Sequence, residues 1–264
     1  MLCENSVKKI LLFFVAVFFC FNSGLICADE FDYENLSRGE VAFGVVFADP
    51  SGSTSYSLTT QGTDLGYDST LGYSEENVFF GRMKYFHKHR FPDISLNAYV
   101  FNYDADSSGT MTFGDQNFDD GTFNSELSAK AIDLSLYFPI KPISVAAFGK
   151  VKVNVGGALR WIDIEQKITE SDLSVTTDAN EYAASLYFDI LYRPFRGLEL
   201  AFEAKALPLT STSFTNLTAR ISYNIFESVF ASAGYMSDSV EIDTEGYKAD
   251  LDTEGPFLEL GWRF

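Results

Sequence analysis

Apolar and polar residues alternate along several stretches of the chain, each about ten residues long. Within 131–138, for example, Ile132, Leu134 and Leu136 are separated by residues of a second face that carries Asp133. Successive side chains of a β-strand point to opposite faces, so this period of two predicts strands with one apolar and one more polar face. Strands of this length and pattern are typical of membrane-spanning barrels.

The connections between these strands alternate in length. Short turns follow the second, fourth, sixth and eighth strands, and long loops rich in Gly, Ser and Asp follow the first, third, fifth and ninth. Outer-membrane barrels have short periplasmic turns and longer external loops, and an even number of strands puts both chain ends on the periplasmic side. The expected strands are 40–48, 77–87, 94–104, 128–138, 146–162, 182–193, 197–207, 216–224, 229–238 and 254–264.

The sequence therefore predicts an all-β fold, a transmembrane antiparallel β-barrel of about ten strands. Eight strands are the alternative, because the ninth strand is weakly patterned and the loop after the seventh is short. No apolar run after the N-terminus is long enough for a spanning helix, and a closed barrel is the other structure that satisfies its backbone groups in lipid.

The N-terminus has the features of a secretory signal peptide. Lys8 and Lys9 precede an apolar run at 10–21, and small residues follow up to Ala28. An uncleaved anchor helix is the alternative, although the apolar core is shorter than the roughly 20 residues that span a bilayer. We expect cleavage after Ala28, which gives a signal peptide at 1–28, an N-terminal periplasmic segment at 29–39 and an outer-membrane β-barrel at 40–264.

Removal of this segment changes the composition. Cys3, Cys20 and Cys27 all lie within it, so the exported chain has no disulfide framework, thiolate metal site or cysteine nucleophile. The segment also carries Lys8, Lys9 and Glu4, and its loss leaves 17 basic and 36 acidic residues, a formal charge of −19. Nucleic-acid binding needs basic residues that neutralise phosphates, so we expect no nucleic-acid partner.

Aromatic residues recur where the expected strands meet their short turns. Tyr85, Phe86, Tyr137, Phe138, Tyr192 and Tyr223 occupy such positions. They predict an aromatic girdle at the periplasmic interface of the membrane.

The last strand ends in Phe264 and carries Leu258, Leu260 and Trp262 at every second position before it. This pattern looks like the signal that the barrel assembly machinery of the outer membrane recognises, and an unpaired strand edge can be captured by strand addition. We therefore expect this strand to bind that machinery.

The segment 207–264 resembles a family of small, functionally uncharacterised outer-membrane barrels of Gram-negative bacteria. The similarity is weaker in the part of the chain before 207, where 133–137 is the best remaining match. It implies an outer-membrane location and a barrel fold, and it brings no established activity or catalytic residues. The matching pieces are Leu207–Leu209, Leu217–Tyr223, Gly234–Tyr235, Gly246–Asp252, Gly255–Phe257 and Phe264.

Charged residues of both signs are expected to face the lumen. Barrels of eight strands are filled by side chains and wide channels need about sixteen, so ten strands favour an ion-paired lumen with little conductance. A narrow channel for ions or small solutes is the alternative, with Arg82, Lys84, Lys150 and Lys152 as its selectivity determinants. The residues assigned to the lumen are Arg82, Lys84, Asp133, Lys150, Lys152, Arg160, Glu199, Glu203, Lys205, Arg220, Glu259 and Arg263.

The expected loops at 48–76, 104–128, 162–182 and 238–254 are acidic, with Lys167 and Lys248 as their only bases. A solvated outer surface explains this composition. A calcium loop is a sharper hypothesis, because Asp104, Asp106, Gly109 and Asp115 have similar spacing to the oxygen ligands of such loops. Flanking helices and the usual bidentate Glu are missing.

Surface hydrolysis commonly requires a histidine base. His87 and His89 are the only histidines, and both fall in a predicted periplasmic turn, whereas acid pairs such as Asp119–Asp120 lack a histidine partner. We assign no catalytic, cofactor-binding or metal residues and expect no enzyme. The sequence predicts a monomeric integral outer-membrane barrel with a structural or surface-interaction role, whose partners are membrane lipid and lipopolysaccharide.

Overall fold

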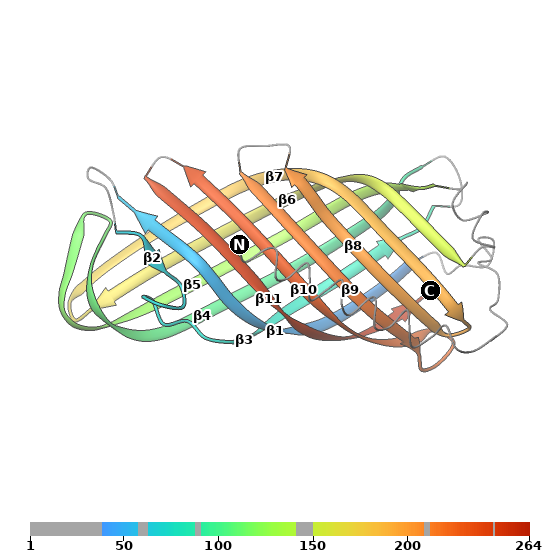
Figure 1. Ribbon diagram of the computed structural model, residues 1–264, viewed down its shortest axis with the longest axis horizontal. Coiled ribbons are helices and arrows are strands. Elements are labelled where there is room, and N and C mark those ends of the chain that lie inside the picture. Colours follow the sequence, from blue (N-terminus) through green and yellow to red (C-terminus); the bar gives the residue numbers. More distant parts are fainter. Residues whose placement is uncertain (1–38, 58–62, 88–90, 141–149, 209–211, 245) are drawn as a thin grey trace.

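The chain folds into a closed β-barrel in which neighbouring strands run antiparallel (Figure 1). Sheet order follows the chain, and β1 pairs with β11 to close the cylinder. This computed structural model describes residues 39–264 except 58–62, 88–90, 141–149, 209–211 and 245, and it does not describe the side chains of 119–120 and 207–208. The expected signal peptide lies outside the described residues. Within them, no helix is long and apolar enough to cross a membrane.

Ten long strands form the wall, which confirms the expected order and rules out the eight-stranded alternative. The short β2 pairs with β1 where β3 has already ended. The strands are β1 (Gly39–Tyr56), β2 (Leu65–Gly66), β3 (Glu76–Tyr85), β4 (Asp93–Phe113), β5 (Gln116–Pro139), β6 (Val151–Glu170), β7 (Leu173–Phe195), β8 (Leu198–Pro208), β9 (Ser213–Asn224), β10 (Val229–Thr244) and β11 (Tyr247–Arg263).

Most of the predictions of long loops are wrong, because the strands continue through these segments. β4 and β5 remain paired up to Phe113 and Gln116, and β6 and β7 up to Glu170 and Leu173. β10 and β11 form a third long hairpin, against which β1 extends. Figure 1 shows these long hairpins at one end of the barrel, the long-hairpin end. The opposite end carries the β3–β4, β5–β6, β7–β8 and β9–β10 connections, which the sequence predicts to be short turns, and we call it the short-turn end.

The β4–β5 turn shows why the loop prediction failed there. Gly114 and Asp115 both have a φ of 61°, the left-handed conformation of a two-residue type I′ turn. Such a turn matches the twist of its flanking strands, so the pairing continues to the tip. In 104–109 both faces of β4 carry polar or small residues, which removes the alternation that marked the strands elsewhere.

The outer surface of the barrel is apolar only near the short-turn end. There, outward-facing Leu134, Leu136 and Leu260 are each at least 40% exposed. On β5 this apolar band ends at exposed Lys130, which stands opposite Asp163 of β6. An apolar band flanked by polar surface is the form of a membrane-spanning barrel. Other members of the band are Phe43, Phe79, Met83, Val100, Ile132, Val155, Leu159, Leu186 and Leu258.

The aromatic girdle is confirmed in part. Tyr85, Phe138 and Tyr223 are exposed near the short-turn end, where Trp262 and Phe264 join them. Tyr137, however, is fully buried in the lumen, where its ring lies 4.8 Å from that of Tyr187, and Phe86 lies under Lys152. Adjacent residues of a strand face opposite sides, so only one of each pair can reach the membrane interface.

The apolar band gives a direct prediction. Leu134→Arg places a charge on the lipid-facing surface and should reduce the free energy of unfolding in lipid vesicles by about 2–4 kcal/mol. Thr122→Arg, an exposed position on the same strand beyond the band, should change it by less than about 1 kcal/mol. Urea titration in vesicles measures both. Equal losses for the two variants would contradict the assignment of the band.

Candidate functional site

The lumen near the short-turn end contains a layer of charged side chains, which we call the ion layer. Its acidic and basic members are equal in number, so the layer is formally neutral. Its acids are Glu40, Asp93, Asp133, Asp189, Glu199, Glu203, Asp238 and Glu259, and its bases are Arg82, Lys84, Lys152, Arg160, Arg193, Lys205, Arg220 and Arg263.

Arg160 of β6 connects three strands across the barrel. Its guanidinium donates two hydrogen bonds of 2.8 Å to Asp238 of β10 and two more to Asp133 of the neighbouring β5. The Phe214 ring lies 4.4 Å from the guanidinium carbon. Lys205 of β8 binds the same Asp133 carboxylate at 2.7 Å. Planar bidentate pairing of this kind fixes geometry as well as charge, so these strands are held at defined positions around the lumen.

A second arginine stabilises the seam of the barrel. Arg82 of β3 donates to Glu40 of β1 and, at 2.8 Å, to Glu259 of β11, so it bonds to both strands that close the cylinder. Arg263 reaches Glu40 at 3.3 Å and Glu199 of β8 at 3.4 Å. The ion pairs therefore link the first and last strands with the far wall.

Above the ion layer, toward the long-hairpin end, the lumen is filled by apolar and aromatic side chains. The connection 63–75 folds inward and buries Leu65, Tyr67, Leu71 and Tyr73. The Tyr67 and Tyr73 rings lie 6.0 Å apart. Burial raises the pKa of Tyr67 well above its usual value, which keeps this phenol neutral. We call this part of the lumen the aromatic layer.

The aromatic layer extends across the full width of the barrel. Thr54 of β1 donates a 3.0 Å hydrogen bond to Gln166 of β6. Tyr73 of the inward connection contacts Tyr103 of β4 at 5.8 Å and hydrogen-bonds with Ser125 of β5. Opposite walls are thus in contact through the lumen, which contains two layers of different chemistry.

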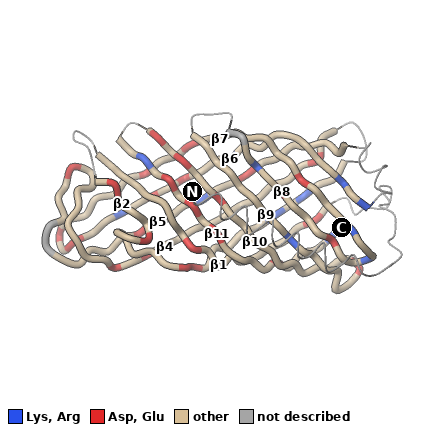
Figure 2. Tube along the Cα trace, viewed as in Figure 1, with Lys and Arg blue, Asp and Glu red and all other residues tan. Residues whose placement is uncertain are grey.

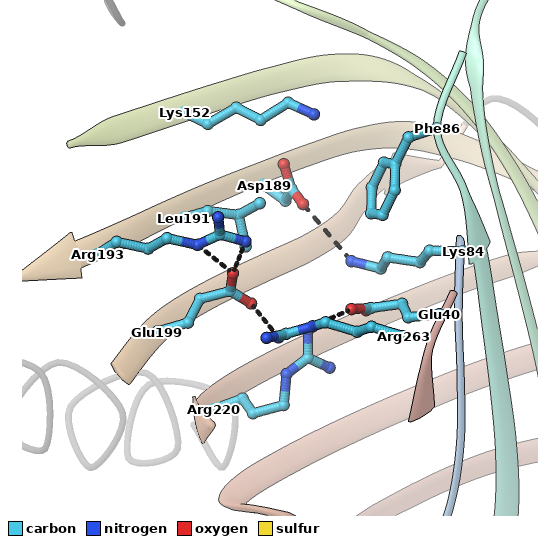
Figure 3. A pocket seen from close by; sticks show the side chains of 10 residues that line it. All are labelled: Glu40, Lys84, Phe86, Lys152, Asp189, Leu191, Arg193, Glu199, Arg220 and Arg263. Carbon is cyan, nitrogen blue, oxygen red and sulfur yellow. Dashed lines mark hydrogen bonds and ion pairs between the residues drawn. The ribbon is translucent and has the colours of Figure 1, made fainter. Parts of the chain in front are cut away.

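A pocket lies in the ion layer close to the short-turn end (Figure 3). Its enclosed space is small, about 20 Å³, close to that of one buried water. Five basic residues and three acidic residues line it, together with Phe86 and Leu191. The charged lining residues are Lys84, Lys152, Arg193, Arg220, Arg263, Glu40, Asp189 and Glu199.

Eleven of the twelve lumen residues expected from the sequence do face the lumen. Lys150 is the exception, since it lies before the start of β6 and is only half-buried. Sequence reasoning missed four acids of the ion layer: Glu40, Asp93, Asp189 and Asp238. Asp189 could have been found, because it is the one charge in the apolar run 186–191. The predicted strands place Asp93 in a turn and Asp238 at the last position of a strand.

The structure does not support the calcium-loop hypothesis. Asp104 and Asp106 belong to β4, and Asn124 of β5 donates a hydrogen bond to each carboxylate. Asp115 lies at the hairpin tip. An extended strand cannot wrap its oxygen atoms around one cation as a loop does. Among the described residues, no group of three His, Cys, Asp or Glu side chains could hold a metal ion.

The two candidates for hydrolytic chemistry do not form a site. His87 lies just after β3 at the short-turn end, as expected, and its backbone N–H donates to Asp93. His89 lies outside the described residues. Asp119 and Asp120 fall within β5, at the opposite end of the barrel.

The long hairpins carry much of the acidic charge, which is visible at the hairpin end in Figure 2. On β10 and β11, Glu241 stands directly opposite Asp250. Partial burial raises the pKa of Asp250, and the nearby charges of Asp252 and Glu241 raise it further. Like charges opposite one another destabilise a strand pair, so this surface is not optimised for stability.

Comparisons with known proteins agree with this fold. No family model and no curated protein sequence matches the chain. The outer membrane protease OmpT of Escherichia coli is 10% identical, with a TM-score of 0.52 over 88% of this chain and 100% of that one. The translocator domain of the autotransporter NalP of Neisseria meningitidis is 11% identical, with a TM-score of 0.39 over 89% and 91%. Ail of Yersinia pestis is 12% identical, with a TM-score of 0.34 over 86% and 99%.

Identities this low establish the fold alone. The chain has the fold of an outer-membrane β-barrel, as the resemblance of the segment 207–264 implied. The protease activity of OmpT does not transfer to it.

Arg160 should dominate the stability of the ion layer. Arg160→Met leaves the Asp238 carboxylate buried without its cation and should reduce the free energy of unfolding by about 3–5 kcal/mol. Lys248→Gln removes an exposed ion pair with Asp243 and should cost less than about 1 kcal/mol. Urea unfolding in lipid vesicles measures both losses. A loss for Arg160→Met no larger than that for Lys248→Gln would contradict the role given to Arg160.

Asp250 should make stability depend on pH. Its raised pKa means that the folded state binds the proton more tightly than the unfolded state, so ionisation as pH rises costs stability. Asp250→Asn should therefore be more stable than the parent at pH 7, and the difference should disappear as pH falls through the pKa of Asp250. Urea midpoints between pH 3 and pH 8 test this, with Asp172→Asn at an exposed turn as the control. A constant difference at all pH values would contradict it.

Proposed function

We propose that the protein is a monomeric integral barrel of the bacterial outer membrane that does not conduct and that acts through its external surface. The short-turn end faces the periplasm, and the long acidic hairpins extend from the outer face of the membrane. The apolar band and the extension of the β4–β5, β6–β7 and β10–β11 hairpins beyond it support this orientation.

One observation carries the proposal: buried side chains contact one another across the lumen in both halves of the barrel. The aromatic layer closes the hairpin half with buried residues such as Tyr67 and Phe123, and the ion layer closes the other half around Arg160. Ions would have to pass side chains that bind one another from opposite walls. A barrel of about this size is narrow enough for its own side chains to fill the interior.

Because the lumen does not conduct in this proposal, the external surface of the barrel is where the protein acts. The hairpins extend the wall beyond the apolar band, and their outward faces are acidic. We propose that they interact with lipopolysaccharide or a partner at the cell surface. We also propose that β11 is the strand recognised by the barrel assembly machinery. Its apolar Leu258, Leu260 and Trp262 all face outward and are exposed.

A narrow channel is the second candidate, and the pocket near the short-turn end is the observation that favours it. The aromatic layer beyond the pocket counts against it, because Tyr73 and Ser125 bond across the path. We propose no enzymatic role, since His87 lies on the periplasmic side, away from the external surface.

Single-channel recording in a planar bilayer distinguishes the two candidates. The protein, refolded in detergent and checked by heat-modifiable gel migration, should produce no discrete current steps. Reproducible steps from the parent protein would contradict the closed lumen. In that case Lys84→Gln and Lys152→Gln should alter the ion selectivity.

A further inference from the structure

The β6–β7 hairpin extends past the strand beside it. β7 begins at Leu173, but β8 ends at Pro208, which stands opposite Ser185 of β7. Figure 1 shows the hairpin continuing beyond β8 toward the long-hairpin end. Among the described residues, no strand pairs with the β8 side of β7 at 173–183, and the connection 209–211 spans at most about 11 Å, too little to cover it. This leaves roughly 35 Å of strand edge, which we call the free edge.

The hydrogen bonds of β7 show which backbone groups the free edge presents. The N–H of Arg193 donates to the carbonyl oxygen of Lys150, on the β6 side of the strand. Bonds to one neighbour recur at every second residue, and the β6–β7 register has no bulge, so the odd-numbered residues of β7 bond to β6. The even-numbered residues therefore direct their N–H and C=O groups at the free edge. These residues are Ser174, Thr176, Asp178, Asn180 and Tyr182.

The free edge lies mostly beyond the apolar band. Asn180 stands opposite Asp163 of β6, which in turn stands opposite Lys130, the residue at which the band ends on β5. Thr176 and Asp178 lie farther toward the hairpin tip and are exposed. Water therefore reaches the unpaired backbone groups, and so does any polypeptide that approaches the hairpin.

The free edge is held in an extended form and lacks the residues that usually block strand edges. The inward-facing Leu173 and Val175 pack against the hydrophobic core that contains the aromatic layer, and Thr177 and Ala179 are buried. The segment 173–183 contains no Lys, Pro or Gly, and its Val, Thr and Tyr residues favour strands. Unpaired backbone groups on such an edge can bind an extended polypeptide by strand addition.

The charges along the free edge indicate which kind of segment fits it. Asp178 stands directly opposite Glu165 of β6, and both side chains are exposed. Glu181 stands opposite the buried Ile162, so it lies on the lumen face of the same edge. Lys167 of β6 is paired with an acid of β5, and within the described part of the chain no base forms an ion pair with Asp178, Glu165 or Glu181. Like charges directly opposite one another destabilise a strand pair, so a base on an added strand beside Asp178 would offset this cost.

We propose that the free edge binds an extended, basic segment of a partner polypeptide at the cell surface by antiparallel strand addition. Two bases three positions apart in that segment would stand beside Asp178 and Glu181, on opposite faces of the added strand. A second copy of the chain fits poorly, because antiparallel pairing of two free edges about their centre places the two Asp178 side chains next to each other. The proposal deepens the surface role given above and rests on it for access from outside the cell.

Fluorescence anisotropy of a labelled peptide, added to the folded protein in non-ionic detergent, tests strand addition. The probe is an eleven-residue peptide of Thr and Val with Arg at positions 3 and 6, and it should bind saturably at one site per chain. Two control peptides should show no saturable binding: one has Glu at both Arg positions, and the other keeps Arg but is N-methylated at positions 4, 6 and 8, which would face β7. Absence of saturable binding by the Arg peptide, or equal binding by its N-methylated form, would overturn the proposal.

Variants of β7 separate strand addition from attraction by charge alone. Thr176→Pro removes one N–H from the free edge without changing the charge or the bonds to β6, and it should weaken peptide binding by about tenfold or more. Thr176→Val keeps the N–H and should bind as the parent does. Asp178→Asn should weaken binding several-fold through loss of the ion pair. Equal affinity of Thr176→Pro and Thr176→Val would overturn the proposal, and if Thr176→Pro does not fold, the N-methylated peptide decides alone.

Sedimentation of the protein in detergent tests the other occupant. The parent should sediment as a monomer, and a dimer that Thr176→Pro dissociates would show that a second copy occupies the free edge, which would overturn the assignment of the partner. Peptide binding in detergent depends on neither conductance nor orientation in a membrane. Its failure therefore overturns strand addition alone, whereas current steps in a bilayer would overturn the closed lumen alone.

Discussion

Charges buried in the lumen must be paired, and the rest of the structure depends on this constraint. Removing a carboxylate or guanidinium from water costs several kcal/mol unless an opposite charge and hydrogen bonds replace the solvent. The ion layer meets the condition by contact across the barrel, as Arg160 does with Asp133 and Asp238. Asp133 lies opposite Arg160 on the neighbouring β5, but Asp238 belongs to β10, so the second pair forms only when the sheet has closed in its native register. The ion pairs in the lumen therefore stabilise the closed form of the barrel.

The lumen contains the ion layer at one end of the barrel axis and the aromatic layer at the other, and the surroundings of the outer surface explain this division. Near the short-turn end, lipid demands an apolar exterior and the polar residues turn inward, where they form the ion layer. Beyond the membrane, water accepts polar side chains outside, and the lumen can fill with Tyr and Phe instead. The inward connection 63–75 is needed there, because β3 ends before its neighbours and leaves a part of the wall incomplete. That connection pairs with β1 through β2 and contributes Tyr67 and Tyr73 to the aromatic layer.

The membrane-spanning half of the fold could be predicted from the sequence, and the outer half could not. Leu134 and its neighbours alternate strictly because lipid and lumen impose opposite requirements on adjacent residues. In 104–109 both faces carry polar or small residues, so this stretch predicts a loop although it is strand. Alternation identified most basic residues of the ion layer but not the acids Asp93 and Asp238, because the expected strands begin after Asp93 and end at Asp238. Which acid meets which base depends on contacts across the barrel, and local sequence carries no record of them.

The central claim is that the two layers seal the lumen, and thiol labelling tests it most directly. A chain that begins at Asp29 has no cysteine, so a single one can be introduced without background. Ser135 lies fully buried in the lumen, and Thr122 is exposed on the outer face of the same strand. In the folded protein, a charged, water-soluble thiol reagent should modify Thr122→Cys rapidly and Ser135→Cys only after unfolding. Rapid modification of Ser135→Cys in the folded barrel would show that water and ions enter the lumen, and it would contradict the account.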